Sequence, residues 1–428
     1  MEERTPVNTS DFLEEKIKIR PRNRKRIVRR AIEVAMLAVL FGLVACVTMV
    51  IVSPVLEEKL FPTPINEVKF PEESASYTSE EVQPEDMLLE EKDEEPSIII
   101  EEPDIETQLL EMIYLLKEKV KECEKWLVQV NGVSNEVSWL ESTNTSSNVA
   151  TGAIIADNGT ELLILVEREY LSRADKIEVT FVDDTMAEGY IKGEDLDAGL
   201  AVVAVPKELM SASTLENCVV VEMASSNNKS LVGSVVMAMG SPNGVTGSVS
   251  YGFVSANSVE INSWDINYRL VMTDIYGVKN PNGFLVNLRG QLIGVLCNDY
   301  NFEDVGNMMT ALGISELKKK IERISNAEAV ALLGVKGTEV TDEANEQHNI
   351  PYGAYVLSVK LDSPAMKAGI QAGDVIVKVG AKDISSMNAL SYHLHQLDVG
   401  QEVTVVIMRQ SQGTYKEGTL NIVLGNQN

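Results

Sequence analysis

A stretch of nineteen residues without a charged side chain, from Val34 to Val52, most constrains what this chain can fold into. A helix of this length crosses a hydrocarbon core of about 30 Å, and Pro54 is placed to end it. A secretory signal peptide has a shorter apolar region, and a long polar segment precedes this one. We therefore expect a transmembrane helix at residues 32–53, and a buried core helix is the alternative.

The charges on the two sides of this segment differ. Residues 1–31 carry ten basic and five acidic side chains, whereas residues 57–106 carry eighteen acidic and three basic ones. Because basic flanks stay in the cytoplasm, we expect a single-pass protein of the cell membrane, with a basic cytoplasmic segment at residues 1–31 and the remainder extracytoplasmic. Seven prolines among residues 54–106 further predict a disordered acidic stalk.

The composition excludes several kinds of partner. A net charge of −27 repels phosphate backbones, so we expect no nucleic acid. The four cysteines lie far apart without a C-x-x-C pair, which argues against a disulfide scaffold or a zinc knuckle. His393 and His395 are two residues apart and would lie on different faces of a helix. We therefore predict no metal site and no cofactor.

An apolar stripe follows the stalk. Its members alternate at spacings of four and three residues, which predicts one face of a helix: Leu109, Ile113, Leu116, Val120, Cys123 and Leu127. Such a stripe forms either a coiled coil that oligomerises the protein or a helix that packs on its own domain. The sequence leaves both interpretations open.

Short runs rich in β-branched residues recur between about residues 130 and 315, separated by Gly, Asn, Asp and Ser. This spacing predicts an all-β barrel or sandwich. A basic amphipathic helix from Ile314 to Ser325 is expected to follow it.

Three segments of this region resemble the trypsin-like domain of the HtrA (Deg) serine proteases: residues 174–205, 233–255 and 280–295. With the C-terminal region, the resemblance covers about residues 125–425. It implies a mainly β protein with a transmembrane helix, a trypsin-like double β-barrel with its leading helix at residues 107–325, and an α+β PDZ domain at residues 326–428.

The resemblance also shows where a catalytic triad would lie. The register of the NGFLVN segment puts Pro281 at the position of the nucleophilic serine. Gly199 falls at the position of the aspartate, and Glu169 at that of the histidine. Proline has no hydroxyl group and lacks an amide for an oxyanion hole. These positions imply a protease fold that has lost its catalytic residues.

A replacement triad is difficult to assemble from the rest of the domain. A serine needs a neighbouring base to become nucleophilic at neutral pH, and that base is usually histidine. The histidines of the chain all follow residue 347: His348, His393 and His395. A cryptic protease built on Ser225, Ser226 or Asp274 is the alternative, although serines at such positions are more simply explained as turn residues.

The segment from Gly353 to Leu394 closely resembles an HtrA-type PDZ domain. Such domains bind an extended peptide beside a helix and hold its terminal carboxylate with the backbone amides of a glycine-containing loop. The resemblance assigns that loop to four consecutive residues: Leu332, Leu333, Gly334 and Val335. Leu390 and Leu394, one helical turn apart, would line the pocket for an apolar terminal side chain, unless they are ordinary core residues.

Two functions are consistent with this sequence. We favour a membrane-tethered pseudoprotease whose PDZ domain binds protein C-termini or unfolded chains, as a scaffold, a sensor or a regulatory subunit. The alternative is an active HtrA-type serine endopeptidase in extracytoplasmic protein quality control. The resemblance further implies a possible homotrimer or an assembly with active relatives.

Overall fold

The computed structural model describes Met36 and residues 66–71, 105–133, 149–172, 174–297 and 307–427. The predicted transmembrane helix, except Met36, and most of the predicted stalk lie outside these residues. Within the described ranges, no helix combines the length and the apolar character needed to cross a membrane. The chain divides into two units, Met1–Pro64 and Ile65–Asn428, and the description below concerns the second.

The first six strands close into a barrel in the order β1-β2-β3-β6-β5-β4. Its inward side chains are mostly Val, Ile, Leu and Ala, and β3 and β6 are buried along nearly their whole length. Such apolar runs suit strands that pack on both faces. The strands are β1 (Leu127–Val133), β2 (Val149–Asp157), β3 (Glu161–Glu167), β4 (Lys176–Thr180), β5 (Met186–Asp195) and β6 (Leu200–Pro206).

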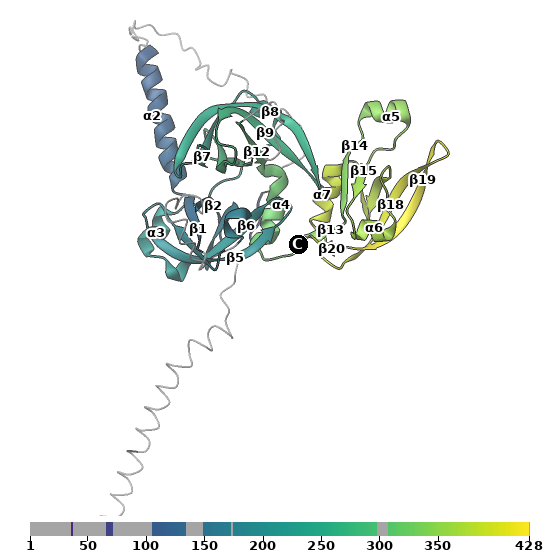
Figure 1. Ribbon diagram of the computed structural model, residues 1–428, viewed down its shortest axis with the longest axis horizontal. Helices are drawn as coiled ribbons and strands as arrows, with labels where there is room; N and C mark the ends of the chain where they lie inside the picture. Colours follow the sequence, from purple (N-terminus) through teal and green to yellow (C-terminus); the bar gives the residue numbers. More distant parts are fainter. Residues whose placement is uncertain are drawn as a thin grey trace, which may run out of the picture. The chain divides into compact units, whose positions relative to one another are not determined.

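A second closed barrel follows in the order β10-β11-β12-β9-β8-β7 (Figure 1). Its longest strands, β8 and β9, form a hairpin whose two-residue turn is Trp264-Asp265. The strands are β7 (Val235–Ser241), β8 (Ser248–Ser263), β9 (Ile266–Tyr276), β10 (Asn282–Asn287), β11 (Leu292–Leu296) and β12 (Met308–Gly313). The short helices are η2 (Arg168–Leu171), η3 (Lys207–Leu209), α3 (Ala212–Asn217) and η4 (Lys229–Leu231).

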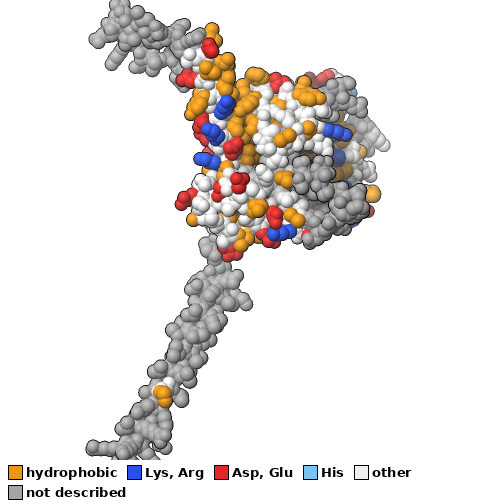
Figure 2. All heavy atoms as spheres, turned by 60° about the vertical axis from the view of Figure 1, so that its left-hand side comes forward, with side chains coloured by type: hydrophobic (Ala, Val, Ile, Leu, Met, Phe, Trp, Pro, Cys, Tyr) orange, Lys and Arg blue, Asp and Glu red, His pale blue; other side chains and the backbone are white. Residues whose placement is uncertain are grey.

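Two longer helices flank the barrels. The helix α4 (Ile314–Ser325) has the predicted bounds, and it buries Ile314, Leu317, Ile321 and Ile324 against the barrels. The helix α2 (Ile105–Glu124) buries only Cys123 completely, while Leu109 is 50% exposed. Hydrophobic side chains are visible along its surface in Figure 2.

One member of the predicted stripe was placed wrongly. Leu127 begins β1 instead of continuing α2. The helix ends at Glu124, and the following residues pair with β2, with Leu127 opposite Ala153. Barrel pairing therefore overrides the helical spacing at this point.

The predicted C-terminal PDZ domain has its own apolar core. Its main sheet has the order β14-β15-β16-β18-β19, with β17 paired to β16, and β13 pairs with β20. Its elements are β13 (Ala331–Leu332), β14 (Val335–Glu339), α5 (Asp342–His348), β15 (Ala354–Val359), α6 (Pro364–Ala368), β16 (Val375–Val379), β17 (Lys382–Asp383), α7 (Met387–Leu394), β18 (Glu402–Ser411), β19 (Thr414–Val423) and β20 (Gly425–Asn426).

The PDZ helices α6 and α7 have well-formed ends. Ser363 and Ser386 are the N-caps of α6 and α7, and each hydroxyl oxygen accepts a backbone amide of the first turn at 3.1 Å. Gly369 ends α6 with a φ of +87°, as expected for a glycine that closes a helix. The mainly β prediction, with a trypsin-like double barrel and a C-terminal PDZ domain, is thus confirmed.

Candidate functional site

The positions at which the resemblance places a catalytic triad lie in η2, before β6 and before β10. Glu169 is exposed in η2, and Gly199 is an exposed turn residue with a φ of +67°. The amide of Arg168 donates to the carbonyl oxygen of Gly199 across 2.8 Å, so the first two positions are close together. Pro281 is buried directly before β10. Glycine and proline supply neither a carboxylate nor a hydroxyl group at these positions.

The alternative catalytic residues make structural hydrogen bonds. The hydroxyl oxygen of buried Ser226 accepts the amide of Ser315 at 3.1 Å, and the Ser315 hydroxyl oxygen accepts the amide of Ser226 at 2.9 Å. These bonds tie the loop before η4 to the start of α4. The carboxylate of Asp274 accepts the amide of Phe253 at 2.6 Å within the β8–β9 hairpin. Both groups therefore hold backbone segments in place.

The histidines lie in the PDZ domain, away from the barrel strands in the sequence. His395 is buried, and burial lowers its pKa to about 3, with Lys320 and Arg323 acting in the same direction. Burial also lowers the pKa of His393. In the part of the chain that the structure describes, no three His, Cys, Asp or Glu side chains are grouped to hold a metal ion.

The segment from Leu332 to Val335, here called the amide loop, connects β13 to β14. Gly334 has a φ of +92°, which glycine adopts without strain. The carbonyl oxygens of Leu333 and Gly334 accept the amides of Ala365 and Lys360 at 2.9 and 2.8 Å. Three successive amides, from Leu333 to Val335, converge on one carboxylate, an arrangement typical of anion-binding loops.

The carboxylate held by this loop belongs to Asp265, in the turn of the β8–β9 hairpin. Its Oδ2 accepts the Leu333 amide at 2.7 Å, and its Oδ1 accepts the Val335 amide at 2.9 Å. The Gly334 amide lies 2.9 and 2.8 Å from Oδ1 and Oδ2. Burial raises the pKa of Asp265 to about 6, although the three amides and Lys320 favour its charged form.

The backbone of Asp265 adds a fourth hydrogen bond to the same segment. Its amide donates to the carbonyl oxygen of Val335 across 2.7 Å. The preceding turn residue, Trp264, lies against two PDZ lysines, with the Nζ atoms of Lys336 and Lys360 at 4.6 and 6.0 Å from the ring centroid. Both turn residues of the hairpin therefore contact the PDZ domain.

The predicted peptide-binding residues fall at two kinds of position. Leu333, Val335, Leu390 and Leu394 are fully buried in one PDZ core cluster, so the leucines of α7 pack as core residues. Leu332 lies in β13, paired with Gly425 of β20. The strand β14 and the helix α7, which would border a peptide groove, both contact the β8–β9 hairpin. The lining role of the two α7 leucines stays a prediction.

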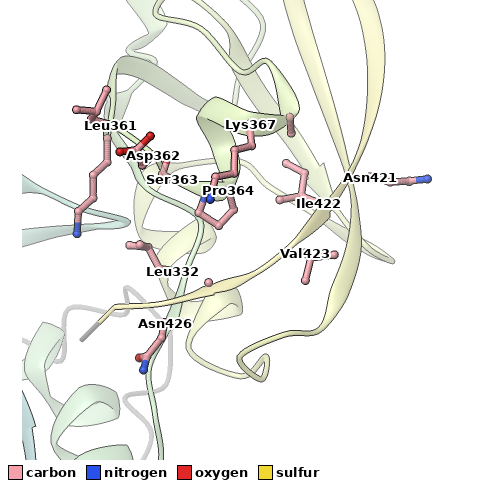
Figure 3. Close-up of a pocket in the computed structure, with 13 residues that line it drawn as sticks. Leu332, Leu361, Asp362, Ser363, Pro364, Lys367, Asn421, Ile422, Val423 and Asn426 are labelled. Atoms are coloured by element: carbon pink, nitrogen blue, oxygen red, sulfur yellow. The ribbon is translucent and has the colours of Figure 1, made fainter.

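A cavity of about 620 Å³ adjoins the amide loop (Figure 3). Leu332 lines it together with residues of the segment before α6, α6 itself and the ends of β19 and β20. Lys360, Asp362 and Lys367 contribute its charged groups. The residues around this cavity do not include the three whose amides bind Asp265, so the cavity borders the amide loop only at Leu332.

Asp265 is the residue that sequence reasoning missed. The sequence signal available was local: a short NSWDIN segment between two strand-forming runs, which indicates a turn. Aspartate is one of the few residues other than glycine that accept a left-handed turn conformation, and Asp265 has a φ of +61°. Nothing in that segment indicates that its carboxylate reaches a loop 68–70 residues later.

Comparisons with known proteins agree with this architecture. Residues 331–422 match the PDZ domain family. The chain is 28% identical over 280 residues to a probable periplasmic serine protease do/HhoA-like of Haemophilus influenzae, covering 64% of this chain and 58% of that protein. It is also 28% identical over 272 residues to the periplasmic serine endoprotease DegP of Escherichia coli, covering 62% and 55%. The alignments thus span little more than half the length of these relatives.

Solved structures give the same result for the fold. The HtrA-type protease AlgW with a decapeptide matches with a TM-score of 0.50 and 21% identity, covering 73% of this chain and 98% of that one. AlgW with a tripeptide matches equally well, covering 73% and 97%. Two closed six-stranded barrels followed by a PDZ domain give this chain the HtrA/DegP-like trypsin-like serine protease fold with a C-terminal PDZ domain.

Proposed function

We propose that this chain is a membrane-anchored pseudoprotease whose PDZ domain binds protein C-termini or unfolded chains outside the cell membrane. The observation that carries the proposed loss of catalysis is Pro281, which lies directly before β10 and which the resemblance to HtrA proteases aligns with the nucleophile. It has no hydroxyl group, and residues 107–325 contain no histidine to act as a base. A scaffold, sensor or regulatory subunit needs neither group.

The catalytic part of the proposal is tested with the purified full chain in detergent. We expect no hydrolysis of unfolded casein and no labelling by a fluorophosphonate serine probe. Pro281→Ser alone should not restore labelling, because the base and its orienting carboxylate would still be missing. DegP of Escherichia coli is a suitable active control. Labelling of one serine in the wild-type chain, abolished by heat, would contradict the proposal.

The second candidate is an active serine endopeptidase in extracytoplasmic protein quality control. The names of the curated relatives favour it, since they are described as periplasmic serine proteases or endoproteases. It requires a nucleophile and a base outside the triad positions. The labelling experiment distinguishes the two candidates directly, and the modified serine would identify the alternative site.

The peptide-binding part is supported by the three convergent amides of the amide loop. A peptide with an apolar C-terminal residue and a free carboxylate should bind the full chain more tightly than its C-terminal amide. Amidation removes the anion but leaves the strand hydrogen bonds available. Equal binding of acid and amide, measured by fluorescence anisotropy, would show that the domain does not recognise chain ends.

The membrane anchor at residues 32–53 is supported by its length without charges and by the basic residues before it. Protease added to intact cells should remove the PDZ domain, whereas residues 1–31 should be protected. Protection of the PDZ domain would reverse the topology. Assembly as a homotrimer, or with active relatives, stays a prediction that light scattering of the purified chain can test.

A further inference from the structure

The donors of the amide loop are already in use within the folded chain. Each backbone amide has one hydrogen to donate, and those of Leu333, Gly334 and Val335 all point to the Asp265 carboxylate. The carbonyl oxygen of Val335 also accepts the Asp265 amide. Asp265 itself is 3% exposed, and the loop residues on either side of Gly334 are fully buried. A peptide carboxylate therefore finds the amides of Leu333, Gly334 and Val335 already occupied in this conformation.

We propose that the β8–β9 hairpin is an intramolecular competitor of the peptide, with Asp265 occupying the place of a terminal carboxylate. The carboxylate accepts the loop amides, and the Asp265 backbone amide donates to β14, as the last residue of an added strand would do. The inference rests on the peptide-binding role proposed above, and it adds the regulation of that same site.

The hairpin is also held from its other side. The Ser263 hydroxyl donates to Asp197 Oδ1 at 2.6 Å, and the Tyr268 hydroxyl donates to Asp197 Oδ2 at 2.8 Å. Lys320 of α4 donates to the Tyr268 hydroxyl oxygen at 2.8 Å. Asp197 lies in the β5–β6 turn of the first barrel. The turn that holds the PDZ loop is therefore tied to both α4 and the first barrel.

This attachment gives the competition a mechanical consequence. A chain end that displaces Asp265 breaks the contact between the amide loop and the hairpin, while the hairpin stem keeps its bonds to Asp197. Binding of a chain end is thus coupled to release of the amide loop from the β8–β9 hairpin. The observed affinity equals the affinity of the open loop multiplied by the fraction of molecules in which the loop is open.

The test removes the Asp265 carboxylate while keeping its backbone conformation. Asp265→Gly suits a φ of +61°, since glycine adopts left-handed values readily. Asp184→Gly is a matched control, because Asp184 has the same φ in the exposed turn between β4 and β5 of the first barrel. Both variants and the wild type are studied as full chains in detergent.

The first measurement needs no ligand. Hydrogen exchange of the amides of Leu333, Gly334 and Val335, followed by mass spectrometry, should become at least tenfold faster in Asp265→Gly and stay unchanged in Asp184→Gly. Unchanged exchange in Asp265→Gly would overturn the inference, whatever the peptide does. Similar acceleration in both variants would also overturn it, because the effect would then be a general loss of stability.

The second measurement uses fluorescein-labelled decapeptides with a free C-terminal leucine, valine or phenylalanine. We expect Asp265→Gly to bind them at least tenfold more tightly than the wild type and the Asp184→Gly control. Faster exchange without tighter binding would overturn the competition. If exchange accelerates but no variant binds a free-acid peptide, the peptide-binding function fails, and with it the competition that depends on it. The Asp265 contact would then stand only as a structural link between the domains.

Discussion

Replacing Lys320 by methionine should strongly destabilise the barrels. The Lys320 side chain is 2% exposed, and its Nζ lies 3.0 Å from Asp195 Oδ2 and 3.4 Å from Asp197 Oδ2. The Asp195 side chain is 1% exposed and that of Asp197 is 13% exposed. Methionine fills much of the same volume but removes the charge, which leaves two acidic groups without their cation. Breaking a buried pair in this way costs about 3–5 kcal/mol.

Urea unfolding of the full chain measures this cost. With an m-value of about 2–3 kcal/mol/M, the midpoint of the barrel transition should fall by about 1–2.5 M. Intrinsic fluorescence is a suitable signal, because Trp126 is buried and its ring lies 6.2 Å from that of Phe284 of β10, edge to face. This aromatic contact is lost when the barrels unfold.

The control is Lys319→Met, one residue earlier on α4. The Lys319 side chain is 27% exposed and pairs with Glu322 at 3.5 Å. Such an i,i+3 pair contributes at most about 0.5 kcal/mol, so the midpoint should hardly change. In a second step, adding Asp195→Asn to Lys320→Met should recover part of the loss, since one uncompensated carboxylate is removed. Equal midpoints for the two lysine variants would refute the reasoning.

Two further predictions concern the PDZ domain. Gly334→Ala should lower the free energy of unfolding by about 2–3 kcal/mol. Alanine is strained at the left-handed φ of this position, and its Cβ would lie 2.3 Å from Cβ of Ser363, which would displace the N-cap of α6. Calorimetry should show a smaller loss of stability for Gly380→Ala, because Gly380 has a φ of +57° but open space where a Cβ would lie. Equal losses of stability in the two variants would contradict the steric explanation. Burial raises the pKa of Asp265 to about 6, so its contact is favoured at low pH and weakens as the pH rises through 6. The peptide affinity of the wild type, divided by that of Asp265→Asn, should therefore be lower at pH 5 than at pH 7.5. Burial lowers the pKa of His395 to about 3, which has the opposite pH dependence, but this effect is present in both proteins and cancels in the ratio. A ratio that does not change with pH would contradict the titration of Asp265.

Local patterns explain the elements that could be predicted. The runs that form β3 and β6 are apolar along nearly their whole length and include β-branched Val and Ile, which favour strands. The bounds of α6 follow from Ser363 and Gly369, which satisfy the helix ends with neighbouring atoms. The amide loop was assigned through the resemblance of this region to an HtrA-type PDZ domain.

The occupant of that loop could not be predicted in the same way. Asp265 and Gly334 are 69 residues apart and belong to different domains, so their contact depends on how the domains pack. The lysines of α4 give another example. Lys318, Lys319 and Lys320 are consecutive and chemically identical, yet it is the Lys320 side chain, 2% exposed, that pairs with two aspartates. A sequence pattern cannot say which of them meets an acidic turn of a distant strand pair.

The sequence alone determined the strand content and the helix caps, and through its resemblance to HtrA proteases it predicted the triad positions and a loop for a terminal carboxylate. These properties depend on residue chemistry and on neighbours within a few positions. Only the tertiary structure decided that Asp265 fills the loop, that Lys320 is buried, and that Leu127 belongs to a strand. Each of these results from long-range packing, because closure of the barrels brings together residues that are far apart in the sequence.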